Sequence, residues 1–209
     1  MSNKLYVIVE GDGELSAVPL LLRRLLYEKF ERYDFSAISP INARGRGNLT
    51  RDGGLERLLE YTRRQPDCDG VLVLFDAEKD DVDCPPRIAY VFAERAAALG
   101  LPFPVSIVCA VCEYESWFLY SDTIADEYFA AVYPDNPDEE CSAKGWINRH
   151  LRTQATYRET IDQTDMSQLL ELDELHHKSR SFRRLVDALT ELLTAIDGGM
   201  KAVTPIADE

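Results

Sequence analysis

The 209-residue sequence contains no apolar run that approaches the roughly 20 residues needed by a membrane-spanning helix. Its N-terminus has one lysine followed by an apolar run that ends in acidic residues, which is unlike a secretory signal. No internal repeat or low-complexity block is present. These absences predict a cytoplasmic protein that does not associate with membranes.

Three motifs that mark common enzyme classes are also missing. The sequence has no Walker-type phosphate loop, no G-x-G-x-x-G fingerprint and no G-x-S-x-G elbow. Their absence disfavours a P-loop NTPase, a Rossmann dehydrogenase and an α/β-hydrolase.

Cysteine and histidine are scarce, with five and three residues respectively. The odd cysteine count and the lack of an export signal predict reduced thiols. Cys109 and Cys112 form a C-x-x-C pattern within an apolar run, but no second pair or nearby histidine pair completes a zinc-binding set. We therefore expect both to pack as small buried hydrophobic residues.

Positive charge is in the minority. The chain has 23 lysine and arginine residues against 37 aspartate and glutamate residues, which gives a formal net charge of −14. Nucleic-acid-binding proteins usually carry basic surfaces, so this balance counts against such a partner. The local field matters more than the total, however, and basic residues gather in three stretches, 44–64, 144–152 and 178–184.

What the sequence does contain is a regular alternation of apolar strands with amphipathic helices. The predicted strands are 5–9, 35–41, 70–75 and 105–111, and the predicted helices between them are 14–31, 54–65 and 86–99. Strands separated by helices of this length form βαβ crossovers and a largely parallel sheet. We expect an α/β core over residues 1–120, a mainly helical C-terminal lobe packed on it over 121–200, and a frayed tail over 201–209.

Two of these strands end in carboxylates. The first leads into Glu10 and Glu14, and the third leads into Asp76, Glu78 and Asp80. In an open parallel sheet, ligands bind at the carboxyl ends of the strands. If the two strands are neighbours, Glu10, Asp76 and Glu78 meet in one crevice, where their repulsion favours protons or a hard cation such as Mg²⁺ or Mn²⁺. The plainer alternative is that the acids are solvated strand ends, which applies most readily to Asp80.

Five stretches carry a resemblance to a known fold. They are VEGDGE at 9–14, VLVLFDAEKDD at 71–81, CEYESWFL at 112–119, TIDQ at 160–163 and SRSFRRL at 179–185. A Glu-Gly-x-x-Glu after the first strand and a later strand ending in an Asp-x-Asp-like element resemble the Toprim fold. Topoisomerases, primases and nucleases of the overcoming-lysogenization-defect type share that fold. More narrowly, the chain is similar to a bacterial Toprim-like domain family of unknown function that is often found beside genes for ATPases.

The resemblance implies roles for individual residues. Glu10 matches the Toprim glutamate, which in the nucleases is a metal ligand or a general base. Asp76 matches the first aspartate of the Asp-x-Asp pair, a metal ligand. The sequence departs from the pattern at Glu78, whose side chain is one methylene longer than the aspartate expected there. Asp80 is a candidate to act as the metal ligand in its place. We expect Glu10, Glu14, Asp76 and Glu78 to form the catalytic set.

Glu113 and Glu115 follow the fourth predicted strand, and strand-like alternation places both on one face. They are candidates to complete a second metal site, with two ions about 3.5–4 Å apart bracketing a phosphate. The alternative is that both pair with arginines of the C-terminal lobe.

Several basic residues are candidates to bind the phosphates of a nucleic acid. Arg44 and Arg46 lie in a glycine-rich loop, where glycine permits a close approach and arginine binds phosphate in a two-pronged manner. Lys144, Arg180 and Arg183 are further candidates. The alternative for each is an ordinary solvated loop or polar helix face.

These observations lead to two hypotheses. The first is a Mg²⁺- or Mn²⁺-dependent endonuclease that cleaves DNA or RNA within a bacterial anti-phage defence or DNA-maintenance system. The second is a non-catalytic partner or regulator of an ATPase, which the negative charge and Glu78 favour. A partner ATPase is expected from the resemblance, and the sequence leaves homo-oligomerisation open.

Overall fold

The computed structural model describes residues 3–77, 83–130, 134–137, 142–153 and 155–206. The strands are β1 (Asn3–Val9), β2 (Phe35–Asn42), β3 (Gly70–Asp76), β4 (Val105–Ala110) and β5 (Val203–Thr204). Helices between the first four strands are α1 (Glu14–Arg24), its π-helical continuation η1 (Leu25–Lys29), α2 (Arg46–Thr50), α3 (Gly54–Arg63) and α4 (Pro85–Ala97). After β4 come a 3₁₀-helix η2 (Tyr114–Tyr120), α5 (Asp122–Tyr128), α6 (Ala143–His150), α7 (Glu159–Leu169), α8 (Leu172–Lys178) and α9 (Arg180–Asp197). None of the described helices is long and apolar enough to cross a membrane.

The five strands form one parallel sheet in the order β2-β1-β3-β4-β5. This arrangement confirms the predicted α/β fold with a parallel central sheet and a helical C-terminal region. The register pairs Val9 with Asn42 and Asp76 with Ala110, so the long strands end at one common edge. β1 and β3 are direct neighbours, which is the condition for Glu10 and Asp76 to meet.

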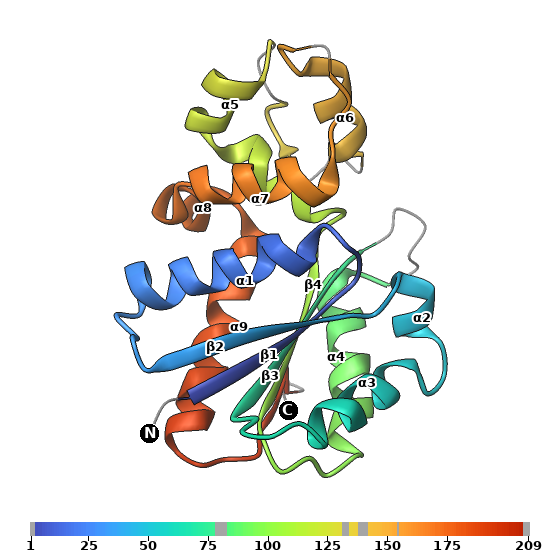
Figure 1. The fold of residues 1–209 in the computed structure, drawn as a ribbon. Helices are drawn as coiled ribbons and strands as arrows, with labels where there is room; N and C mark the ends of the chain where they lie inside the picture. The colour runs from blue at the N-terminus through green and yellow to red at the C-terminus, as the bar shows by residue number, and fades with distance from the viewer. Residues whose placement is uncertain (1–2, 78–82, 131–133, 138–141, 154, 207–209) are drawn as a thin grey trace.

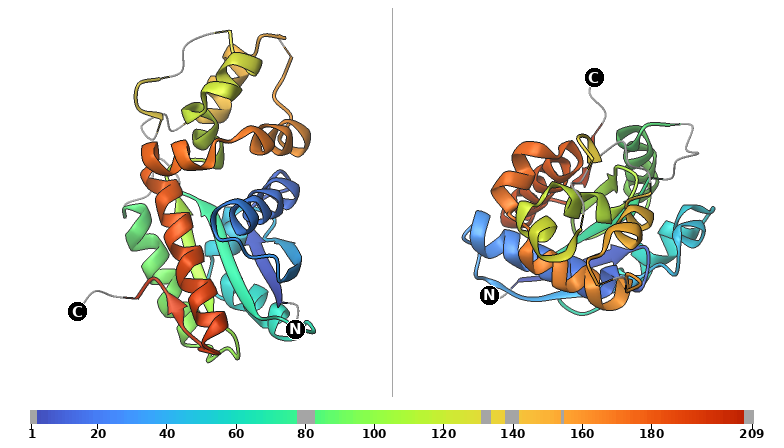
Figure 2. Two further views of the ribbon diagram at one scale, coloured as in Figure 1. Left: turned by 90° about the vertical axis from the view of Figure 1, so that its left-hand side faces the viewer. Right: turned by 90° about the horizontal axis from the view of Figure 1, so that it is seen from above.

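Both faces of the sheet are buried, as the continuous apolar strands predict. Along β1, Leu5, Val7 and Val9 face a core built with α1 and α9, whereas Tyr6 and Ile8 face a second core built with α3 and α4. The sheet is therefore sandwiched between two helical layers, and α9 runs along one of its faces (Figure 2).

The remaining helices lie beyond the carboxyl edge of the sheet, at the top of Figure 1. α5, α6, α7 and α8 form this group, and α7 packs against α1. α9, which we expected within the C-terminal lobe, turns back and packs on β4 and β3. The lobe is thus joined to the core at both of its ends, directly above the edge where the acidic residues lie.

Three local features differ from the sequence-based expectation. The first long helix changes from α-helical to π-helical geometry at Leu25. The basic glycine loop contains the short helix α2. The tail, expected to fray, contributes β5, because Thr204 reaches the Ser106 hydroxyl at 2.8 Å and the strand pairs with β4.

The prediction of reduced, buried cysteines is wrong for Cys112. Cys68, Cys84 and Cys109 are free, but Cys112 is disulfide-bonded. Cys109 is buried in β4 as expected, whereas Cys112 follows the strand with a left-handed φ of 60° and is only half-buried. The buried apolar run therefore ends before Cys112.

Candidate functional site

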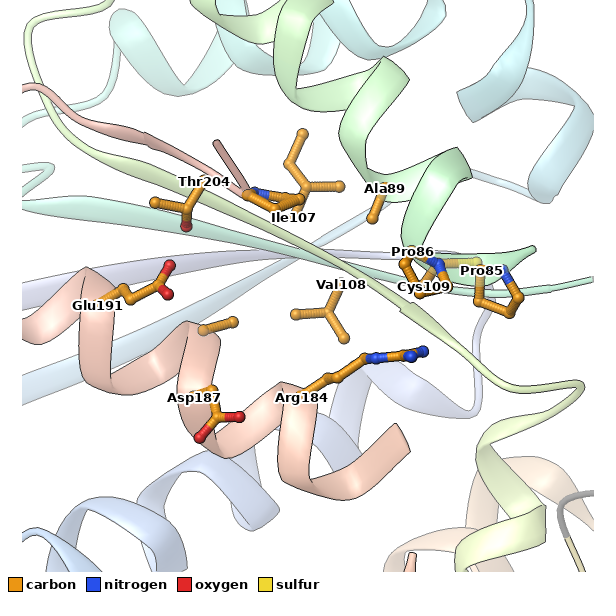
Figure 3. A pocket seen from close by; sticks show the side chains of 12 residues that line it. Pro85, Pro86, Ala89, Ile107, Val108, Cys109, Arg184, Asp187, Glu191 and Thr204 are labelled. Carbon is orange, nitrogen blue, oxygen red and sulfur yellow. The ribbon is translucent and has the colours of Figure 1, made fainter. Parts of the chain in front are cut away.

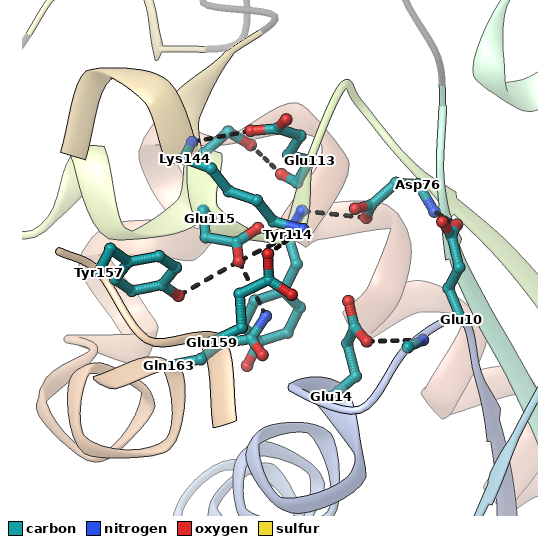
Figure 4. A network of polar contacts seen from close by, with 12 residues as sticks. Glu10, Glu14, Asp76, Glu113, Tyr114, Glu115, Lys144, Tyr157, Glu159 and Gln163 are labelled. Carbon is teal, nitrogen blue, oxygen red and sulfur yellow. Dashed lines mark hydrogen bonds and ion pairs between the residues drawn. The ribbon is translucent and has the colours of Figure 1, made fainter. Parts of the chain in front are cut away.

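Glu10 and Asp76 meet at the carboxyl edge of the sheet, as their placement after neighbouring strands predicts (Figure 4). The Asp76 amide donates a hydrogen bond to Glu10 Oε2 at 3.3 Å. Asp76 Oδ1 in turn accepts from the Tyr114 amide at 3.0 Å, which ties the end of β3 to the start of η2. Backbone amides of neighbouring elements therefore hold both carboxylates in place.

Glu14 is the third carboxylate of this group. It begins α1 and is buried, and its Oε2 accepts a hydrogen bond from the Gly11 amide at 2.8 Å. The turn between β1 and α1 thus folds the Glu14 side chain back toward Asp76 and Glu10 (Figure 4).

The pKa values of Glu10 and Asp76 are both raised, first by burial and then by neighbouring carboxylates. Burial raises the pKa of Asp76 well above its usual range, and the charges of Glu115, Glu14 and Glu10 raise it further. Burial also raises the pKa of Glu10, although the Asp76 amide opposes this effect. The group therefore favours binding a proton or a cation at this edge.

Glu113 and Glu115 lie on the lobe side of the same edge, and each contacts Lys144. Glu113 Oε2 accepts a hydrogen bond from the Lys144 amide at 2.8 Å, at the start of α6. Glu115 is fully buried, and its Oε1 lies 3.8 Å from Lys144 Nζ. The alternative hypothesis expected arginines of the C-terminal lobe as partners of these glutamates. The partner in these contacts is instead a lysine of the lobe.

Two further donors hold Glu115 Oε1. The Tyr157 hydroxyl donates to it at 3.2 Å and the Gln163 Nε2 at 3.3 Å. Glu115 Oε2 and Gln163 Oε1 are buried without a hydrogen-bond partner within the described part of the chain. Burial raises the pKa of Glu115 to about 8, while the charge of Lys144 opposes the rise.

Sequence reasoning did not identify Tyr157, Gln163 or Glu159. Glu159 pairs with Lys144 Nζ at 3.4 Å. Gln163 falls within the TIDQ stretch that carried part of the resemblance, but nothing in the sequence assigned it a partner. These contacts depend on the tertiary fold, because α5 and α6 separate Glu115 from these residues in the sequence.

Lys144 supplies the positive charge of the site. Its side chain extends from α6 toward the space between Glu115 and Asp76 (Figure 4). Burial lowers the pKa of this amine, but Glu115, Asp76 and Glu159 more than offset that effect, so the pKa is raised. The lysine is therefore held as an ammonium ion by the carboxylates around it.

Residues 9–190 match the family described as "Domain of unknown function (DUF4276)". The chain belongs to this family. The matched region runs from the last residue of β1 into α9, so it contains Glu10, Asp76, Glu115 and Lys144. No curated protein matches the sequence.

The loop that carries Arg44 and Arg46 borders the acidic group of this DUF4276 domain. Arg46 Nη1 donates to the backbone oxygen of Asp76, and the Gly45 amide donates to the backbone oxygen of Glu10 at 2.8 Å. Arg44 is exposed and lines an open hollow of about 460 Å³ together with Gly11, Asp12, Asn42 and Gly45. Both predicted phosphate-binding arginines of this loop therefore lie beside the acidic strand ends.

The two arginines of α9 have different surroundings. Arg180 is exposed in the first turn of α9. Arg183 Nη1 donates to the backbone oxygens of His176 at 3.1 Å and His177 at 2.8 Å, and so caps the end of α8. The structure thus gives Arg183 a role in joining α8 to α9.

A separate, mainly apolar hollow of about 230 Å³ lies where α4 and α9 flank β4 and β5. In Figure 3, Arg184, Asp187 and Glu191 project from α9 on one side, and Pro85 and Pro86 lie on the other. The acidic group at the carboxyl edge does not line this hollow.

Glu78 and Asp80 lie outside the described residues, so the metal-ligand and catalytic roles expected of them stay predictions. Within the described ranges, no group of three or more histidine, cysteine, aspartate or glutamate side chains is arranged to hold a metal ion. The donor chemistry nevertheless suits a hard cation, because the carboxylates of Glu10 and Asp76 converge at this edge. A divalent ion therefore fits the kind of ligand that this edge provides.

Proposed function

We propose that this protein is a divalent-metal-dependent phosphodiesterase that cleaves nucleic acid. The observation that carries the proposal is the convergence of Glu10 and Asp76 from neighbouring parallel strands, with the pKa of both raised. A pair of carboxylates brought together in this way is costly for folding unless a proton or a cation neutralises its charge, and such pairs often mark functional sites. The Toprim-like resemblance points to the same chemistry.

Glu10 and Asp76 are the proposed ligands of Mg²⁺ or Mn²⁺, with Glu78 and Asp80 of the adjoining segment as further ligands. When bound, such an ion activates a water molecule and polarises a phosphate. Glu14, oriented by the Gly11 amide, is the proposed acceptor of a proton from the attacking water.

Basic residues around this edge are proposed to bind the substrate. Lys144 presents an ammonium beside Asp76, and Arg44 lies exposed at the adjoining hollow. A phosphodiester strand passing this edge would therefore meet positive charge on both sides of the carboxylates, despite the net charge of −14. The proposed setting is a bacterial cytoplasmic defence or DNA-maintenance system.

Cleavage assays with single- and double-stranded DNA and RNA in Mn²⁺ or Mg²⁺ test the proposal. We expect Asp76→Asn and Glu10→Gln to abolish cleavage while both variants stay folded. Asp173→Asn is the matched control, because it removes one carboxylate that is 89% exposed and pairs with Lys29 on the surface. Cleavage that survives both site substitutions would contradict the proposal.

The second candidate is a non-catalytic partner of an ATPase. It is favoured by the absence, among the described residues, of a ready-made group of three metal-binding side chains, and by the presence of Lys144 as a counter-ion. This candidate predicts a stable complex with the ATPase. It would be supported over the nuclease if the Asp76→Asn variant still formed the complex and still functioned in cells.

A further inference from the structure

Lys144 contacts both of the carboxylates, Glu113 and Glu115, that a second metal ion of a two-metal site would use. We had expected Glu113 and Glu115 to complete such a second site. Instead, Glu113 binds the Lys144 amide at 2.8 Å and Glu115 lies 3.8 Å from Lys144 Nζ. Both carboxyl groups are thus directed to one residue, Glu113 through a hydrogen bond with its backbone amide and Glu115 through its proximity to the ammonium.

We propose that the site takes one divalent ion, at Glu10 and Asp76, and that Lys144 is the second cation of the site. This inference rests on the proposed metal-dependent function and specifies how many ions that function uses.

The anchoring of Lys144 supports this assignment. Its amide is fixed by Glu113 at the start of α6, and its ammonium lies between Glu115 and Glu159, 3.4 Å from the latter. Asp76 and Glu14 also act on its charge. Its side chain is 30% exposed and lies among these carboxylates.

The surroundings of Glu115 argue in the same direction. A carboxylate that serves a metal needs a free oxygen facing an open space, but Glu115 is fully buried and its Oε1 already receives Tyr157 and Gln163. A divalent ion at the remaining oxygen would lie close to the ammonium, and two cations at such a distance in a buried site repel strongly. The elements that hold Glu115 are therefore arranged for a resident lysine.

Calorimetric titration with MnCl₂ at fixed ionic strength tests the inference. We expect wild-type protein to bind one ion and Asp76→Asn to bind none. Lys144→Met removes the resident cation, so it should either admit a second ion or bind the first at least roughly tenfold more tightly. Lys144→Arg keeps the charge and should bind one ion, as wild type does.

Lys29→Met is the matched control for Lys144→Met. Lys29 is also a partly buried lysine, 25% exposed, that pairs with a carboxylate, but it lies in η1 and pairs with Asp173. Its loss changes the net charge equally and should leave both the number of ions and their affinity unchanged.

The outcomes separate this inference from the proposed function. If wild type binds two ions and Asp76→Asn binds neither, the single-ion assignment is wrong and the metal-dependent function still holds. This comparison does not depend on the folding of a Lys144 variant. Unchanged binding in a folded Lys144→Met protein would also overturn the single-ion assignment. No ion bound to wild type would instead remove the proposed function itself.

Discussion

Glu115 is a residue whose ionisation is coupled to folding. Its pKa is about 8 in the folded protein against an ordinary value of 4.5, because burial disfavours the carboxylate. A raised pKa means that the protonated form favours the folded state, so this contribution to stability is complete below pH 4.5 and is lost as pH rises toward 8. We expect Glu115→Gln to remove this loss, with a difference from wild type that reaches on the order of 3–5 kcal/mol.

The measurement is the free energy of unfolding in urea, with a chelator present, at several pH values between 4.5 and 8. Tyr157→Phe should change the pH dependence of stability in the opposite direction. The substitution deletes a hydroxyl that donates to Glu115 Oε1, and this loss favours the neutral form of Glu115. The stability of this variant should fall more steeply with pH than that of wild type. Parallel curves for Glu115→Gln and wild type would contradict the account of Glu115.

At the scale of elements, the contact between α1 and α7 decides how closely the lobe approaches the core. Gly13, just before α1, has φ −65° and ψ −44°, so alanine could adopt its backbone without strain. A Cβ there would lie 2.2 Å from Gln163 Oε1 and 3.1 Å from Glu159 Cβ. Gln163 is buried and bonded to Glu115, so it has little freedom to move. We expect Gly13→Ala to lower the free energy of unfolding by about 1–3 kcal/mol.

Gly47→Ala is the control for this substitution. Gly47 lies in α2, and a Cβ added to it meets nothing within 4 Å. Alanine is the better helix former, so the change should be neutral or stabilise by up to about 1 kcal/mol. Equal denaturation midpoints for the two variants would show that Gln163 and Glu159 of α7 do not pack closely against Gly13.

The elements also show what sequence reasoning can and cannot reach. Apolar runs located β1, β3 and β4 to within two residues, because a strand buried on both faces leaves a continuous signal. The meeting of Glu10 and Asp76 followed from strand ends alone. Tyr157 and Gln163 were missed because their role comes from α7 and the preceding segment folding back onto η2, which no local pattern encodes. β5 was missed because two residues carry no periodicity, and its position depends on β4.

At the scale of the whole molecule, the net charge of −14 should weaken the folded state through self-repulsion. Added NaCl screens this repulsion, so the melting temperature should rise with salt in wild type and in Asp76→Asn alike. A divalent ion that binds the carboxyl edge adds a separate effect. At a free concentration 100-fold above its Kd, it stabilises by about 2.7 kcal/mol, or about 5–10 °C for a domain of this size.

The two effects can be separated by melting the protein in NaCl and in MnCl₂ at equal ionic strength. The additional rise in Mn²⁺ should appear in wild type and in the Asp173→Asn control but not in Asp76→Asn, because Asp173 is an exposed surface carboxylate and Asp76 is the proposed ligand. A Mn²⁺ effect of equal size in all three proteins would mean that the ion acts on the overall charge alone. In that case the carboxyl edge would not be a metal site. The buried carboxyl group of Asp76, with its raised pKa, would then serve another function, such as contact with a partner protein.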